Sequence, residues 1–153
     1  MGRESAEGKF MVAVGAIIEN TTTDKILLIQ RSDRLDFRPG VWEYPIGRIK
    51  QFEELDEGLK REVKEETGLV HIQIIKPINV FHFYRGKKTA ENEVVGIIYW
   101  VQTKSETITL SEEHASFSWL SNQEAFEKIK EEWIKRDIRL YMQEKKLKNI
   151  FYG

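Results

Sequence analysis

The sequence predicts an α/β fold, in which helices cover both faces of one mixed β-sheet as an α/β/α sandwich. Segments rich in Val and Ile alternate with turn-forming residues along much of the chain, which indicates strands. One central segment and one near the C-terminus instead repeat apolar residues every three or four positions, as amphipathic helices do. At 153 residues the chain is about one domain long, so both kinds of element are expected to share one core.

The first elements are two predicted strands and a long loop. Residues 10–18 and 25–30 are apolar, and the turn-forming run NTTTD lies between them. Residues 32–47 contain a Pro-Gly pair and a second Pro, so we expect an irregular loop that leads into the central helix. Loops of this kind often carry function.

The second half of the chain continues the sheet and ends in a helix. Residues 71–84 and 93–103 are expected to be long strands around a polar turn, and residues 116–120 a short one. Residues 123–148 have helical spacing, and Ser121 or Asn122 is a suitable N-cap. This helix should close one side of the sheet.

No repeat, low-complexity segment or Pro-rich linker divides the chain. We therefore expect a flexible start over residues 1–8, followed by a single domain over residues 9–153. No run of 18 apolar residues occurs, and the opening residues lack an apolar signal core, so the prediction is a cytoplasmic protein without a membrane partner. The net charge of −1 gives no general attraction to nucleic acid, and nothing in the sequence sets the oligomeric state. The absence of Cys excludes disulfides and thiolate chemistry.

The most informative segment is residues 47–69, GRIKQFEELDEGLKREVKEETGL. Within it, Glu62, Glu65 and Glu66 are three or four positions apart, which places them on one helix face. Such like-charge pairs cost roughly 0.2–0.5 kcal/mol each in a helix, whereas a divalent cation would reverse the effect. Carboxylate oxygens suit Mg²⁺ or Mn²⁺, with water and substrate completing the coordination.

The same segment predicts how this helix docks. Leu55, Leu59 and Val63 recur every four residues and form an apolar stripe beside the carboxylates. Gly68 is expected to end the helix in a left-handed conformation. An isolated acidic cluster is more often a solvated helix face, but here the surrounding pattern argues for a site.

The complete pattern resembles a Nudix box. Gly47 is followed by five residues, Glu53, seven residues, and then REVKEETGL. The chain therefore resembles the Nudix hydrolase family, whose members cleave nucleoside diphosphates linked to a further group by metal-assisted attack of water at phosphorus. The resemblance implies the Nudix form of the sandwich. Ile46 and Phe52 stand where many members have Gly, and these changes should stiffen or reshape the loop.

The resemblance also implies roles for the box residues. Glu62 and Glu66 are the expected direct ligands of Mg²⁺, and Glu65 is the expected ligand of an additional ion. Glu53 would act as an outer-sphere ligand or orient water, and Arg61 would orient a carboxylate.

Two positions outside the helix complete the implied metal site. The backbone carbonyl of Ile46 is carried over as a ligand. Glu113 matches an acidic loop residue that ligates an additional ion or removes a proton from water. For Glu113 a solvated loop charge is an equal alternative, and for His114 and Trp119 a local hydrogen bond and core packing are favoured.

Four further residues are candidates for binding substrate. Arg31 follows a strand and could bind phosphate with its cationic fork, and Arg85 lies in a basic turn that could reach distal phosphates. Trp42 and Tyr84 offer ring faces for stacking on a base. The alternatives are solvated charges for the arginines and core packing for the rings.

Within the family, the segments LLIQRSDRLDF and SEEHASFSWLS are most similar to the dihydroneopterin triphosphate and dATP pyrophosphohydrolase branch. That similarity implies a nucleotide or pterin triphosphate as the small-molecule partner, cleaved to a monophosphate and pyrophosphate. The alternatives are a dinucleoside polyphosphate such as diadenosine tetraphosphate, and binding of a nucleotide without turnover. An RNA-end substrate is disfavoured because no basic stripe is evident.

Overall fold

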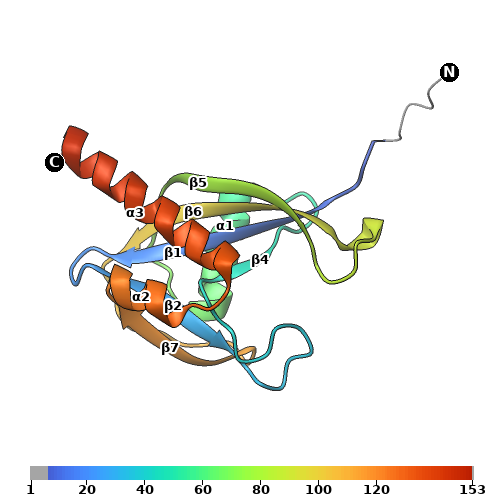
Figure 1. The fold of residues 1–153 in the computed structure, drawn as a ribbon, viewed down its shortest axis with the longest axis horizontal. Helices are drawn as coiled ribbons and strands as arrows, with labels where there is room; N and C mark the ends of the chain where they lie inside the picture. The colour runs from blue at the N-terminus through green and yellow to red at the C-terminus, as the bar shows by residue number, and fades with distance from the viewer. Residues whose placement is uncertain (1–6, 153) are drawn as a thin grey trace.

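The computed structural model describes residues 7–152, so most of the predicted flexible start, residues 1–6, lies outside the described residues. One seven-stranded sheet has helices on both of its faces (Figure 1). Its strands are β1 (Met11–Asn20), β2 (Lys25–Arg31), β3 (Trp42–Glu43), β4 (Ile46–Arg48), β5 (Gln73–Tyr84), β6 (Glu93–Thr103) and β7 (His114–Leu120). The helices are α1 (Leu55–Thr67), the 3₁₀-helix η1 (Ala90–Asn92), α2 (Asn122–Lys128) and α3 (Glu132–Tyr152).

The sheet is mixed, as predicted. The main path runs β3-β2-β1-β6-β5, while β4 pairs with β1 and β7 pairs with β2. The central strands β1 and β6 are parallel, and the other pairs are antiparallel. Both central strands are rich in Val and Ile because both of their faces are covered.

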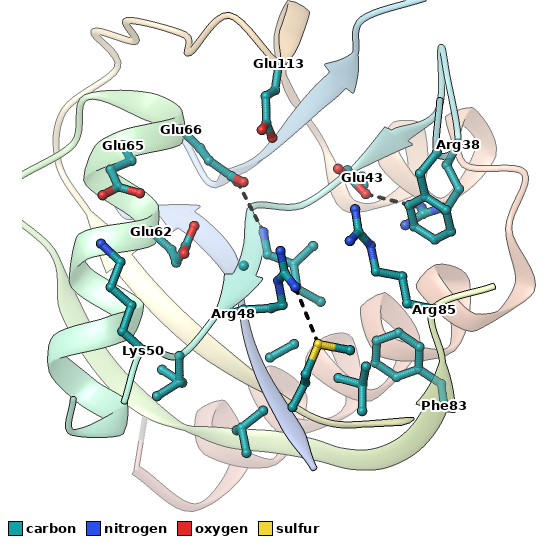
Figure 2. Close-up of a pocket in the computed structure, with 18 of the residues that line it drawn as sticks. Arg38, Glu43, Arg48, Lys50, Glu62, Glu65, Glu66, Phe83, Arg85 and Glu113 are labelled. Atoms are coloured by element: carbon teal, nitrogen blue, oxygen red, sulfur yellow. Dashed lines mark hydrogen bonds and ion pairs between the residues drawn. The ribbon is translucent and has the colours of Figure 1, made fainter. Parts of the chain in front are cut away.

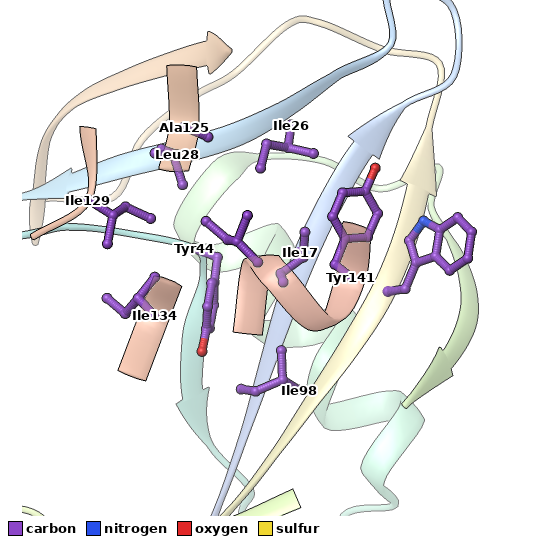
Figure 3. Close-up of a cluster of buried hydrophobic side chains, with 11 residues drawn as sticks. Ile17, Ile26, Leu28, Tyr44, Ile98, Ala125, Ile129, Ile134 and Tyr141 are labelled. Carbon is purple, nitrogen blue, oxygen red and sulfur yellow. The ribbon is translucent and has the colours of Figure 1, made fainter. Parts of the chain in front are cut away.

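Two apolar clusters fill the space between the sheet and its helices. On one face, Tyr44 packs with Ala125 of α2 and with Ile134 and Tyr141 of α3 (Figure 3). On the other face, Leu59 and Val63 of α1 pack against the strands. The α/β/α prediction is therefore confirmed, and the two clusters fix α1 and α3 on opposite sides of the sheet.

The predicted stripe of α1 is confirmed for Leu59 and Val63, which are buried, but Leu55 is 37% exposed. Leu55 is the first residue of the helix and extends beyond the sheet surface that the other two cover. Gly68 ends the helix with φ +76°, and its N–H donates to the carbonyl of Lys64 over 2.9 Å.

The prediction of one helix over residues 123–148 is wrong, because the chain breaks between α2 and α3. Ile129 adopts an extended conformation at the end of α2 and buries its side chain in the core. The break lets α3 take a new direction, which a continuous apolar repeat does not reveal. Ser121 is the N-cap of α2, since Glu124 N–H donates to its hydroxyl over 3.2 Å.

The loop predicted over residues 32–47 contains two short strands. In β4, Gly47 pairs with Val14 of β1, which anchors the start of the box directly on the central sheet. Strands of two or three residues, such as β3 and β4, are too short to show a period in the sequence.

A buried polar contact ties this loop to α3. The Tyr44 hydroxyl donates to Asp137 Oδ2 over 2.5 Å, and the amide of Asn79 donates to Asp137 Oδ1 over 2.7 Å. Burial and the charge of Asp137 raise the pKa of Tyr44 well above its usual value, so it remains a donor. Tyr44 precedes Pro45 and Ile46, and the contact therefore fixes the backbone that enters the box.

We predict that Tyr44→Phe lowers the free energy of unfolding by about 1–3 kcal/mol, because buried Asp137 loses a donor. Urea unfolding measures this change. The matched control is Tyr99→Phe, whose hydroxyl has no hydrogen bond within residues 7–152 and whose loss should change stability by less than about 0.5 kcal/mol. Equal losses in the two variants would contradict the assigned contact.

Candidate active site

A single cleft brings most of the candidate residues together. It has a volume of about 1560 Å³ and is lined by residues of β1 to β6, α1, α3 and the loops between them. Figure 2 shows the box carboxylates Glu62, Glu65 and Glu66 on one side of the cleft, and Arg38 and Arg85 on the other. The cleft thus has an acidic side and an arginine side.

Arg61 organises the acidic side. Its Nε and Nη2 atoms donate to the two oxygens of Glu53 over 2.6 and 2.8 Å. Its Nη1 atom donates to Glu62 over 2.8 Å and to Glu65 over 3.1 Å. The remaining contact is to the carbonyl of Arg48 at 3.0 Å. The fork of one guanidinium therefore holds three carboxylates in a fixed arrangement.

Glu53 is held firmly in its ionised form. The hydrogen bonds from Arg61 and then from the backbone N–H of Lys50 lower the pKa of Glu53 to about 2. Its side chain lies behind Arg61 and does not line the cleft. This geometry suits a residue that orients its neighbours.

Glu66 is in the opposite electrostatic situation. Its side chain is buried, with 8% of the residue exposed, and Oε2 accepts a hydrogen bond from the backbone N–H of Ile46 over 3.2 Å. Burial, followed by the negative charges of Glu43, Glu62 and Glu113, raises the pKa of Glu66 well above its usual value. An ionised Glu66 is therefore unfavourable here unless a cation lies beside it.

The expectation that Glu62, Glu65 and Glu66 converge is not met in the described residues. No three acidic or histidine side chains within residues 7–152 lie close enough together to hold a metal ion. Arg61 draws Glu62 and Glu65 toward itself, whereas Glu66 turns toward Ile46. Mutual repulsion among carboxylates favours this separation.

The residues nevertheless fit a divalent cation. A Cβ atom at Gly47 would lie 2.0 Å from the carboxyl group of Glu62, so only glycine allows the β4 backbone to come this close. The approach places backbone oxygens and carboxylates in one region, and the negative charges of Glu43, Glu62 and Glu113 all act on Glu66 there, which favours a cation over a further carboxylate charge. Oxygen donors of this kind match Mg²⁺ or Mn²⁺.

Glu43 is a site residue that the sequence reasoning missed. It is 1% exposed and lines the cleft between the acidic and arginine sides. Its carboxylate lies 3.4 Å from Arg31 Nη1, 3.2 Å from Arg38 Nη2 and 3.6 Å from His114 Nε2. In the sequence, the only indication that Glu43 belongs to the site is its position between two aromatic residues in the segment WEYP. Glu43 holds both arginines at the cleft.

Glu113 also lines the cleft, and its side chain is exposed. Its negative charge contributes to the raised pKa of Glu66, which places the two carboxylates in one electrostatic field. The neighbouring His114 is buried, and the indole N–H of Trp119 donates to a backbone carbonyl. These contacts agree with the local and packing roles favoured for His114 and Trp119.

The arginine side includes three of the four candidates for substrate binding. Arg31, Tyr84 and Arg85 line the cleft. The guanidinium groups of Arg31 and Arg85 lie 5.9 and 5.2 Å from the centre of the Phe37 ring. Arginines stacked on an aromatic ring form a cationic, planar surface that can bind phosphate or a flat ring.

Trp42 does not belong to this surface. It is absent from the cleft lining, its ring packs on the cluster beneath α2 and α3, and Lys128 Nζ lies 4.3 Å from its centre. Because β3 directs this side chain toward α2, the expectation of base stacking by Trp42 is corrected to core packing.

Comparison with known proteins identifies the class. The model of the NUDIX domain matches residues 9–141. The chain belongs to the Nudix hydrolase family, whose enzymes act on pyrophosphate bonds. No helix of residues 7–152 is both long and apolar enough to span a membrane.

Individual relatives are similar to this chain over different lengths. The bis(5′-nucleosyl)-tetraphosphatase (asymmetrical) of Rattus norvegicus is 33% identical over 113 residues, which cover 71% of each protein. Nudix hydrolase 6 of Arabidopsis thaliana is 39% identical over 64 residues, which cover 42% of this chain and 23% of that protein. The chain thus matches less than a quarter of this longer plant relative.

Solved structures share the fold over most of their length. A MutT protein from Methanosarcina mazei superposes with a TM-score of 0.72 at 28% identity, covering 92% of this chain and 99% of that one. The dihydroneopterin triphosphate pyrophosphohydrolase of E. coli superposes with a TM-score of 0.68 at 20% identity, covering 83% and 91%. At 20% identity, the similarity to the E. coli structure is evidence for the fold alone.

We predict that Glu66→Gln stabilises the metal-free protein near neutral pH. The folded pKa of Glu66 lies above its usual value of 4.5, so folded protein binds the extra proton and loses stability as pH rises through this interval. The variant should therefore unfold at higher urea than wild type at about pH 7, and the advantage should vanish below about pH 4.

The control for this comparison is Glu57→Gln, at an exposed position in the first turn of α1. It should show no comparable stabilisation. If metal-free Glu66→Gln is equally or less stable than wild type at neutral pH, then Glu66 does not experience the repulsion described above.

Proposed function

We propose that this chain is a Mg²⁺-dependent hydrolase that cleaves a nucleoside or pterin triphosphate to a monophosphate and pyrophosphate, with Mn²⁺ as a possible substitute. The observation that carries the proposal is the buried carboxylate of Glu66, which feels the negative charges of Glu43 and Glu62 in a cleft whose other side is cationic. Such a cleft combines a place for a cation with groups that bind anionic phosphates.

The proposed ligands of the cation are Glu62, Glu66 and the backbone carbonyl of Ile46. Glu65 is proposed for a further ion, because it lines the same cleft. For Glu113, which also lines the cleft, ligation of that ion is the alternative to the role of general base. A bound divalent cation would neutralise phosphate charge and lower the pKa of a coordinated water.

The other acidic residues would position groups or move protons. Arg61 holds Glu53, Glu62 and Glu65, so it would keep the ligands oriented while substrate enters. Glu113 is the proposed general base, because it is exposed to the cleft and free to reach a water molecule beside the acidic side.

The arginine side would bind the substrate itself. Arg31 and Arg85 would contact phosphate oxygens, and the ring of Tyr84 would pack on a base or pterin. Glu43 would hold Arg31 and Arg38 in place, since it contacts both. Trp42 is excluded from this proposal because it packs away from the cleft.

A second candidate function is hydrolysis of a dinucleoside polyphosphate. The rat relative, whose name states this kind of activity, shares 33% identity over 71% of each protein. A cleft of about 1560 Å³ also exceeds the roughly 300–1,000 Å³ typical of small-molecule sites. Binding without turnover is disfavoured, because the box retains all of its carboxylates.

The proposed reaction is tested by product analysis with Mg²⁺ and a panel of nucleoside triphosphates, dihydroneopterin triphosphate and diadenosine tetraphosphate. Release of pyrophosphate from a triphosphate supports the first function, and turnover restricted to the dinucleoside supports the second. No turnover of any substrate by folded protein with metal bound would overturn both.

On the preferred substrate, we predict that Glu66→Gln lowers kcat at least about 100-fold, because a charged ligand is replaced by a neutral side chain of similar size. The circular dichroism spectrum should remain that of wild type. Glu57→Gln is the matched control and should retain the wild-type rate; an unchanged rate in Glu66→Gln would remove that residue from the proposed metal site.

For Glu113→Gln we predict a fall in kcat of about 10²–10⁴-fold with little change in the concentration of Mg²⁺ needed for half-maximal rate. A general base acts on the chemical step, whereas a ligand also changes metal affinity. A wild-type rate would make Glu113 a solvated loop charge, and a matching loss of Mg²⁺ affinity would make it a ligand instead.

A further inference from the structure

Within residues 7–152, packing does not explain the presence of Phe52 in the box. Its side chain lies on the rim of the cleft, and the residue is 96% exposed, the largest fraction among the exposed large hydrophobic residues described. Burial of an aromatic ring normally stabilises a fold, but this ring remains almost entirely in solvent. The fold therefore gains little from the side chain.

The backbone of Phe52 is also unfavourable for its residue type. Phe52 has φ +65°, the left-handed conformation, and is the third residue of a turn closed by Glu53 N–H and the carbonyl of Lys50 at 3.2 Å. Turns with positive φ at this position favour Gly or Asn. A bulky residue that is both strained and exposed is better explained by binding than by folding.

The turn that carries Phe52 is fixed relative to the acidic side of the cleft. Glu53 Oε1 accepts from Lys50 N–H over 3.0 Å, and both of its oxygens accept from Arg61. The same guanidinium contacts the box carboxylates Glu62 and Glu65. The ring of Phe52 is therefore presented from an anchored turn next to the carboxylates.

This turn and the arginine side lie across the cleft from each other. Figure 2 shows Lys50 beside the box carboxylates, whereas Arg38, Phe83 and Arg85 lie on the far side. Lys50 is exposed and lines the cleft, so the turn that carries Phe52 also carries a cation. A cation paired with a bare aromatic face matches the phosphate and base of a nucleotide.

We infer that Phe52 stacks on an aromatic ring carried by the leaving half of the substrate, so that the cleft takes molecules with a ring on each side of the cleaved phosphoanhydride. The inference rests on the second candidate function, hydrolysis of a dinucleoside polyphosphate, because the pyrophosphate released in the first candidate function carries no ring. One half would bind at Tyr84 and Arg85, and the other at Lys50 and Phe52. Water oxygen bonds to phosphorus, the bridging P–O bond breaks with its electron pair on the leaving phosphate, and the water proton passes to the base.

The test compares analogues with one and two rings. Methylene-bridged analogues of ATP and of diadenosine tetraphosphate resist hydrolysis at the bridged position, and calorimetry in Mg²⁺ measures their Kd. Phe52→Gly should raise the Kd of the two-ring analogue about tenfold and change that of the one-ring analogue less than about twofold. Phe52→Trp should retain wild-type affinity for both. An unchanged Kd, an equal rise for both analogues, or no binding of the two-ring analogue to wild type would overturn the inference.

Two comparisons separate binding from folding and from general surface effects. Gly adopts φ +65° without strain, so Phe52→Gly should melt no lower than Phe52→Ala. Phe151→Ala removes an equally apolar ring that is 72% exposed near the end of α3, and it should leave both Kd values unchanged. Turnover of the substrate panel by wild type reports on the proposed hydrolysis separately, because it does not depend on which residue holds the second ring.

Discussion

The buried carboxylate of Glu66 is the constraint on which the site depends. Leu59 and Val63 dock α1 on the sheet, and this docking buries Glu66, which lies on the same helix. There the nearby charges of Glu43 and Glu62, together with burial, oppose ionisation. A cation in the cleft would stabilise the ionised form of Glu66. The helix that stabilises the core therefore also creates a site that favours a bound cation.

The rest of the fold fixes what surrounds that carboxylate. The short strand β4 places Gly47 against β1, and its missing side chain leaves room for Glu62. On the opposite face of the sheet, Asp137 of α3 holds Tyr44 and thereby the backbone that enters the box. The two apolar clusters are consequently linked through the loop between β3 and β4, and the site lies where the elements of both faces meet.

The spacing of the box, the position of α1 and the mixed sheet could be predicted from the sequence because each depends on local period or on a nearly complete motif. The remaining features depend on contacts between distant residues. The extended Ile129 that separates α2 from α3, the burial of Glu43 and the packing of Trp42 beneath α2 arise only when the layers assemble. The separation of Glu65 from Glu66 likewise follows from where Arg61 lies, which helical spacing alone does not reveal.

Thermal unfolding of the wild-type protein with and without Mg²⁺, from about pH 5 to pH 8, tests the central claim most directly. If a divalent cation binds at the buried carboxylates, then Mg²⁺ should raise the Tm. The increase should grow with pH, because protons compete less with Mg²⁺ for Glu66 as the pH rises. An increase that is absent, or that does not depend on pH, would contradict a metal site built around Glu66.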